Sequence, residues 1–109
     1  MGQFKTRLVG VTFEGRQERV ALLSNGQKLF WKHEADNPHD SNAMRVYVDV
    51  GMTQDVGHLR ANLAKKLMER KKEKGCGYEV FVEKLTGGEK GLNYGVIILV
   101  VTTWPQKIS

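Results

Sequence analysis

The sequence lacks the features that stabilise small secreted proteins or anchor membrane proteins. It contains a single cysteine, Cys76, so no internal disulfide can form. No apolar run approaches the roughly 20 residues that a membrane helix needs, and the longest, residues 96–101, is only as long as a strand. The first residues lack the apolar centre of a secretory signal peptide. We therefore expect a cytoplasmic protein without a membrane partner, in which Cys76 stays reduced.

Motifs for nucleotide hydrolysis and for zinc binding are also missing. No Gly-rich loop ending in Lys and Ser or Thr is present to hold phosphates, so we expect no ATPase activity from this chain. The residue types that zinc prefers do occur, but no CxxC or HxxxH spacing connects them. These residues are His33, His39, His58 and Cys76. The sequence therefore predicts neither a cofactor nor a structural metal.

The composition is that of a small globular protein with excess positive charge. The chain has 109 residues, of which 40% are hydrophobic, and 17 Lys and Arg against 12 Asp and Glu give a formal net charge of +5. This length suits one domain, which we expect to span residues 1–109. The positive charge favours phosphate-bearing partners, although many basic proteins bind no nucleic acid.

The most distinctive stretch is residues 36–43, which read Asp-Asn-Pro-His-Asp-Ser-Asn-Ala. Pro38 fixes its own backbone angle and keeps Asn37 out of the helical conformation. Asp and Asn side chains can bond to the backbone two residues further on, which makes a loop rigid without help from a core. We expect a well-ordered turn that could hold polar side chains outward for a partner.

Hydrophobic periodicity predicts an α+β fold that is mainly β, a small barrel of six strands with two helices. Residues 60–72 have the apolar spacing of a helix, which Gly75 would end. Residues 14–26 fit either a strand or a short helix stopped by Asn25 and Gly26, and we interpret them as a helix. The segments 44–50 and 56–59 should pair as a hairpin. The predicted strands cover residues 5–13, 28–33, 44–50, 56–59, 78–85 and 94–103.

Five short motifs occur along the chain: Leu8-Val9-Gly10-Val11, Glu14-Gly15-Arg16-Gln17, the loop at 36–43, Val56-Gly57-His58-Leu59 and Leu85-Thr86-Gly87-Gly88. Together and in this order they resemble the HIRAN domain family, over about residues 4–101. The resemblance implies one HIRAN-like domain with a core at about residues 4–103 and an OB-like barrel fold. Family members occur fused to helicase-type ATPases or nucleases, or alone, so a role in DNA repair or processing is implied.

The resemblance also implies a DNA-binding site. A helicase-linked member of the family binds the 3′ end of single-stranded DNA, stacking bases on aromatic side chains and holding the terminal hydroxyl with polar loop residues. By this resemblance, Phe13 and His39 would stack on bases, and Asp40 and Asn37 would contact the terminal sugar. The implied contact residues are Phe13, Asp36, Asn37, His39, Asp40 and His58.

Basic residues at the start of the predicted helix adjoin His58 in the sequence. If DNA passes the loop, we expect Arg60, Lys65 and Lys66 to contact its phosphate backbone. A charge run of this kind can also be no more than the solvated face of a helix. Asp40 and Asn37 have a structural alternative too, since both could serve only to stabilise their own turn.

The sequence departs from the helicase-linked member at several implied contacts. That protein has an arginine and two tyrosines where this chain has Thr12, Phe13 and Glu14. His39 replaces a tyrosine, and Ala61 replaces a lysine. One aromatic face is thus retained at Phe13, while the arginine is lost and a carboxylate is gained.

Three functions fit these residues. The first is a nucleic-acid-binding module for single-stranded DNA or free 3′ ends. The second, favoured by the lost arginine, is a protein-interaction module that docks on a separate helicase or nuclease. The third is a metal-dependent nuclease. Asp36, Asp40 and Asp55 could hold its divalent cation, but no second cluster of carboxylates with a lysine supports this function.

Overall fold

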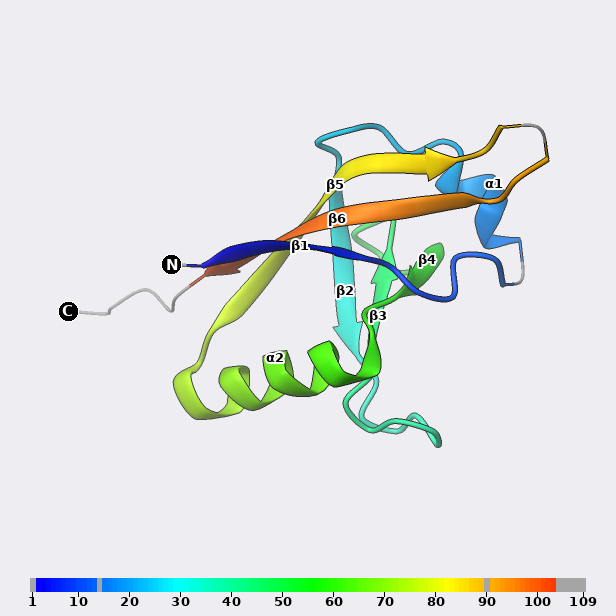
Figure 1. The fold of residues 1–109 in the computed structure, drawn as a ribbon. Coiled ribbons are helices and arrows are strands. Elements are labelled where there is room, and N and C mark those ends of the chain that lie inside the picture. Colours follow the sequence, from blue (N-terminus) through cyan, green and yellow to red (C-terminus); the bar gives the residue numbers. More distant parts are fainter. Residues whose placement is uncertain (1, 14, 90, 104–109) are drawn as a thin grey trace.

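The chain folds into six strands and two helices over the residues that the computed structural model describes, which are 2–13, 15–89 and 91–103 (Figure 1). Glu14, one of the departures from the family pattern, lies outside these residues. The elements in chain order are β1 (Gln3–Arg7), α1 (Arg16–Val20), β2 (Lys28–His33), β3 (Met44–Tyr47), β4 (Asp55–His58), α2 (Ala61–Lys74), β5 (Gly77–Gly87) and β6 (Tyr94–Thr103).

The strands form one antiparallel sheet that bends into a half-barrel. Its order is β1-β6-β5-β2-β3-β4, in which β2 joins the two halves of the sheet. Lys28 and Leu29 of β2 pair with β5, whereas the rest of β2 pairs with β3. The two ends of the sheet meet at a bridge in which the Val9 and His58 amides each donate to the other's carbonyl, at 2.9 and 3.0 Å. This architecture confirms the expected mainly-β, α+β class and the β3–β4 hairpin.

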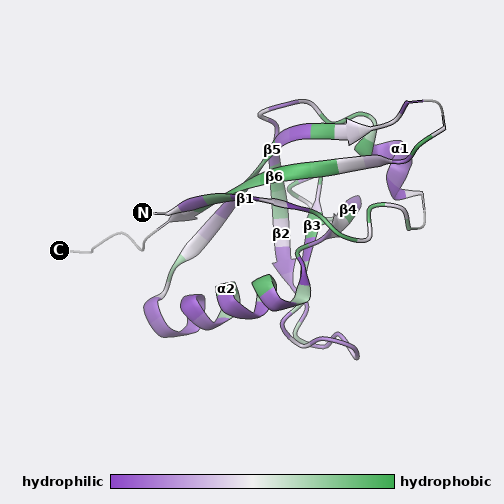
Figure 2. Ribbon diagram, viewed as in Figure 1, coloured by the Kyte–Doolittle hydropathy of each residue, from purple (hydrophilic) through white to green (hydrophobic). Residues whose placement is uncertain are grey.

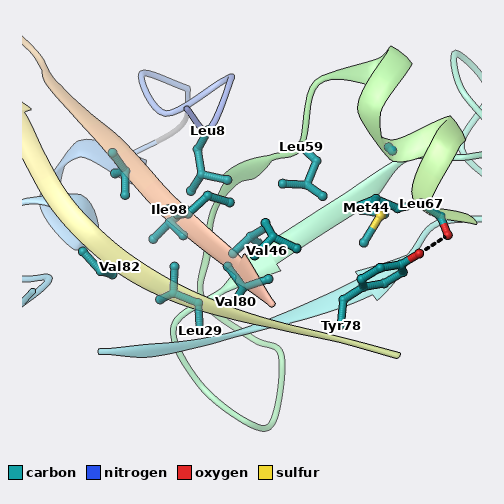
Figure 3. Close-up of a cluster of buried hydrophobic side chains, with 14 of the residues drawn as sticks. Leu8, Leu29, Met44, Val46, Leu59, Leu67, Tyr78, Val80, Val82 and Ile98 are labelled. Atoms are coloured by element: carbon teal, nitrogen blue, oxygen red, sulfur yellow. Dashed lines mark hydrogen bonds between the residues drawn. The ribbon is translucent and has the colours of Figure 1, made fainter. Parts of the chain in front are cut away.

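The hydrophobic core fills the inside of the half-barrel (Figure 3). Val80 and Val100 face each other across the β5–β6 pair, and both are fully buried. Helix α2 closes one end of the core, where the Tyr78 hydroxyl donates a 2.7 Å hydrogen bond to the Leu67 carbonyl. Burial of the ring raises the pKa of Tyr78 above its ordinary value, so this hydroxyl stays a donor.

Helix α2 packs through the apolar stripe that the sequence predicted. Ala64 and Leu67 are buried and Leu63 is partly buried against the core. The helix ends at Gly75, which has a left-handed backbone conformation (φ 69°) that would be strained in a residue with a side chain. Figure 2 shows that most of the other residues of α2 are hydrophilic. Neither described helix is long and apolar enough to cross a bilayer.

The first predicted strand and the first predicted helix are shorter than expected. Strand β1 ends at Arg7 rather than at residue 13, because the chain turns at Gly10, which has a φ of 71°. Helix α1 confirms the helical interpretation, but it ends at Val20 rather than at Asn25 and Gly26. The Gly26 amide instead donates to the Val82 carbonyl (2.7 Å), which ties the α1–β2 connection to the sheet.

Two later strands also differ in length from the prediction. Strand β3 ends at Tyr47 instead of residue 50, because Asp49 accepts hydrogen bonds from the Thr53 and Gln54 amides and folds the chain back. Strand β5 continues to Gly87 and contains a bulge between Val82 and Lys84. The extra residue explains why the apolar positions change spacing after Val82, since a bulge shifts the alternation by one.

Candidate nucleic-acid interface

An open hollow of about 370 Å³ lies where the chain after β1, the β2–β3 loop and the start of α2 meet. We call it the loop hollow. Five of the predicted contact residues line it: Phe13, Asn37, His39, Asp40 and His58. The remaining lining is mainly apolar: Val9, Gly10, Ala43, Leu59 and Ala61. The structure thus gathers side chains from three separate segments on one surface.

The polar loop is held rigid by its own side chains. The Asn37 Oδ1 atom accepts hydrogen bonds from the amides of His39 (2.9 Å) and Asp40 (3.0 Å). Asp40 Oδ1 accepts from the Asn42 amide at 2.9 Å. Both residues therefore have the turn-stabilising role that the sequence allowed. In the described part of the chain, Asp40 Oδ2 has no hydrogen-bond partner and remains an acceptor at the half-buried rim of the hollow.

Phe13 lies on a turn that a buried arginine fixes. The Phe13 amide donates to the Gly10 carbonyl (3.2 Å), and the same carbonyl accepts from Arg16 Nη1 (2.8 Å). Gly10 cannot be replaced easily, since a Cβ there would lie 3.3 Å from the Phe13 ring and 3.0 Å from Arg16 Nη1. This turn leaves the Phe13 residue 63% exposed, which is unusual for an aromatic side chain.

Glu34, which no sequence pattern singled out, does not line the loop hollow but contacts two residues that do, His58 and Asn37. Its Oε1 atom lies 2.9 Å from His58 Nε2 and 3.4 Å from Asn37 Nδ2. Its Oε2 atom lies 2.9 Å from Arg45 Nε, as an ion pair rather than an aligned hydrogen bond. The available signal was a carboxylate just after a predicted strand and just before the loop.

Ion pairs continue from Glu34 to the turn that carries Phe13. Arg45 also contacts Asp55, Nη1 to Oδ2 at 2.9 Å. Asp55 Oδ2 accepts from Arg16 at 2.7 Å, and Asp55 Oδ1 accepts from Arg19 at 3.1 Å. A connected set of charges thus joins His58 on one side of the loop hollow to the Gly10 turn on the other. We call this set, from Glu34 through Arg45 and Asp55 to Arg16, the ion-pair frame.

Both carboxylates of the frame are held ionised. Burial by itself would raise the pKa of Glu34, but the hydrogen bond from His58 and the adjacent Arg45 guanidinium outweigh it and lower the pKa. Burial opposes ionisation of Asp55 as well, and its arginine partners, Arg16 first, again lower its pKa. Near neutral pH the frame therefore consists of charged groups.

Four predicted contacts lie outside the loop hollow. Asp36 is exposed on the loop but does not line the hollow, and Lys65 is exposed on α2. Arg60 is directed toward β1, with Nη2 at 3.4 Å from Thr6 Oγ1. Lys66 lines a separate hollow of about 450 Å³ between β1 and α2. Any contact of these residues with a ligand would be made beyond the hollow.

No group of His, Cys, Asp and Glu arranged to hold a metal ion occurs within residues 2–13, 15–89 and 91–103. Of the three aspartates considered for a nuclease, Asp55 is bound by arginines. Asp40 is engaged in its own turn through one oxygen. The described residues therefore give no support to a metal-dependent reaction.

A half-barrel with two helices, and a loop hollow that presents an aromatic ring and a carboxylate, are features of a small binding module. The HIRAN domain family matches residues 1–100, and the chain belongs to this family. HIRAN domains are DNA-binding modules, so membership supports nucleic-acid binding.

Comparison with solved structures confirms the fold. The crystal structure of the HIRAN domain of human HLTF is similar, with a TM-score of 0.64 and 22% sequence identity, covering 94% of this chain and 77% of that chain. At this identity the likeness concerns the fold alone. Comparison with curated protein sequences gave no match.

Proposed function

We propose that the loop hollow binds the 3′ end of single-stranded DNA, in a DNA repair or processing context. The observation that carries this proposal is the combination, in one hollow, of an exposed aromatic ring and a carboxylate with an unused oxygen. A base needs a flat apolar surface, and a terminal hydroxyl needs an acceptor. Both are present, and family membership supports nucleic acid as the ligand.

Phe13 supplies the stacking surface. Its residue is 63% exposed, so a base placed on the ring would remove apolar area from water. Stacking of this kind contributes about 1 to 3 kcal/mol per base. His39, also exposed and lining the same hollow, offers a second planar side chain. Neither contribution depends on base identity, so we expect little sequence preference.

Asp40 supplies the preference for the 3′ end. A carboxylate oxygen accepts a hydrogen bond from a hydroxyl, and it repels a phosphate because both groups are negative. Asp40 is fixed by its bond to the Asn42 amide, and its second oxygen can bind the ligand without loss of the turn. DNA strands commonly carry a free hydroxyl at the 3′ end and a phosphate at the 5′ end, so the carboxylate favours the former.

Positive charge for the preceding phosphates comes from α2. Ala61, at the first position of the helix, lines the loop hollow, and no side chain caps this helix end. Its first turn also contains no acidic residue. Free amides and the helix dipole favour an anion there. Lys65 and Lys66, exposed on the same helix, would extend the attraction along the strand.

Fluorescence anisotropy of labelled single strands tests this proposal. Strands with a free 3′ hydroxyl are compared with identical strands carrying a 3′ phosphate, at two salt concentrations. We expect the hydroxyl strand to bind more tightly, and Asp40→Asn to reduce that preference. Asp36→Asn is the matched control, since Asp36 is on the same loop but outside the hollow.

The outcomes separate the candidate functions. Equal binding of both strands would contradict end recognition and leave only electrostatic attraction. An equal effect of Asp36→Asn and Asp40→Asn would contradict the assignment to the loop hollow. Absence of binding at low salt would contradict the DNA proposal and favour docking on a separate helicase or nuclease.

A further inference from the structure

We infer that Glu34 is a positioning residue for the proposed 3′-end site, acting on DNA through His58. This inference rests on the proposed function for its effect on binding. Glu34 does not line the loop hollow, whereas His58 does. The 2.9 Å contact between Glu34 Oε1 and His58 Nε2 links the two residues, which lie 24 positions apart in the sequence.

The contact fixes which ring nitrogen of His58 is available. The lowered pKa of Glu34 keeps this carboxylate ionised near neutral pH, and an ionised carboxylate can only accept hydrogen bonds. His58 Nε2 must therefore carry the proton that it shares with Glu34. Nδ1 is then the ring nitrogen left for a ligand in the hollow that His58 lines. Without Glu34 the ring could exchange its tautomers and rotate.

Glu34 is itself held from several elements. Its amide donates to the Ala43 carbonyl (2.8 Å), and its own carbonyl accepts from the Asn37 amide (3.1 Å), so both ends of the loop are tied to its backbone. The groups that face its side chain are His58 from β4, Arg45 from β3 and Asn37 from the loop. Arg45 is fixed in turn by Asp55. A carboxylate held on so many sides has one available geometry, as a positioning residue requires.

The ion-pair frame connects the residues that hold Glu34 to the opposite wall. From Arg45 the contacts pass through Asp55 to Arg16, which fixes the Gly10 carbonyl under Phe13. The polar and the aromatic walls of the hollow are thus set by one connected group of side chains. Glu34 is the member of the ion-pair frame that contacts His58.

A charge-matched pair of variants tests the inference. Glu34→Gln removes a negative charge from the frame, while the control Glu79→Gln removes one from an exposed ion pair with Lys28. Both changes increase attraction to DNA by the same formal charge. We expect Glu79→Gln to bind a 3′-hydroxyl strand as well as the wild type or better. We expect Glu34→Gln to bind about tenfold more weakly, because an amide can donate to His58 as well as accept from it and therefore no longer fixes the ring.

A double-mutant cycle asks whether Glu34 acts through His58. In a His58→Ala background, Glu34→Gln should change affinity by less than twofold, because the group that it positions is gone. An unchanged tenfold loss in that background would overturn the inference. Tighter binding by Glu34→Gln alone, matching the control, would overturn it as well.

Measurement of the His58 ring nitrogens by ¹⁵N NMR, without DNA, separates failure of this inference from failure of the proposed function. The folded and unfolded forms give separate signals and only the folded signals are compared, so a loss of stability does not imitate the effect. We expect the neutral ring to carry its proton on Nε2 in the wild type and in Glu79→Gln, and to populate both tautomers in Glu34→Gln. The same tautomer mixture in all three proteins would overturn the inference, whether or not DNA binds.

Discussion

Asp55 is expected to be the most important single charge for the stability of this fold. Its carboxylate contacts three arginines: Arg16, Arg19 and Arg45. The Asp55 side chain is 17% exposed and that of Arg16 is 7% exposed. The substitution Asp55→Asn keeps the shape of the side chain and removes its charge, so that the nearly buried Arg16 guanidinium loses its counter-ion.

The size of the effect follows from this burial. Removing one partner of a buried ion pair costs about 3 to 5 kcal/mol, because the other charge is left uncompensated. Asp55 is not fully buried, and Asn can still accept one hydrogen bond, so we expect the lower end, about 3 kcal/mol at neutral pH. Domains of this size have about 5 to 15 kcal/mol of total stability. The melting temperature should fall by about 10 to 15 °C.

The stabilisation by Asp55 should decrease as the pH falls. The arginine partners lower the pKa of Asp55 in the folded state, despite the opposing effect of burial. Its contribution is therefore fully present above the unfolded-state pKa, about 3.9, and is lost as the pH falls through the lower pKa of the folded state. Since Asn resembles the protonated acid, wild type and Asp55→Asn should converge in stability at acid pH.

Urea unfolding followed by circular dichroism between pH 7 and pH 3 measures both effects. Asp36→Asn is the control, because Asp36 is exposed and its side chain has no ion pair among the described residues. It should change the free energy of unfolding by less than about 0.5 kcal/mol. A loss below 1 kcal/mol for Asp55→Asn, or a loss that is the same at pH 7 and pH 3, would mean that the Asp55 charge does not stabilise the buried Arg16.

Three further predictions concern single positions. Phe13→Ala should weaken single-strand binding by about 1 to 3 kcal/mol and leave the melting temperature nearly unchanged, because the ring is exposed; an unaltered affinity in the anisotropy assay would exclude Phe13 as the stacking residue. Gly57→Ala should destabilise the protein by more than 1 kcal/mol, because the new Cβ would lie 2.8 Å from the Val9 carbonyl oxygen. Hydrogen exchange at the Val9 amide should become faster, and equal or slower exchange would contradict this prediction. Lys65→Ala should reduce the slope of log affinity against log salt by about 0.7, and an unchanged slope would mean that it contacts no phosphate.

Elements with strong local signals were predictable from the sequence. Strand β6 has the predicted bounds because its apolar run is long and unbroken, and α2 is recognisable from its stripe and from Gly75. Element ends depended on contacts made elsewhere. Strand β1 ends early because the chain turns at Gly10, whose carbonyl Arg16 binds, and because Val9 pairs with His58 instead of β6; neither contact is visible in a local pattern.

The site was predictable where residue type and backbone chemistry coincide. Asn37 and Asp40 occupy the turn positions that Asx bonding favours, and both line the loop hollow. Glu34 was overlooked because its role depends on His58, a partner that comes near only when β2, β3 and β4 have paired. The direction of Arg60 toward Thr6 was equally invisible, since a helix-start arginine can turn to either side.

Amide chemical-shift mapping of the ¹⁵N-labelled protein with a short single strand bearing a free 3′ hydroxyl shows where DNA ends bind. If they bind in the loop hollow, the largest shifts are expected at Phe13, at residues 37–40 and at His58, with smaller ones at the start of α2. Shifts confined to the hollow between β1 and α2, around Phe4 and Lys66, would contradict binding in the loop hollow.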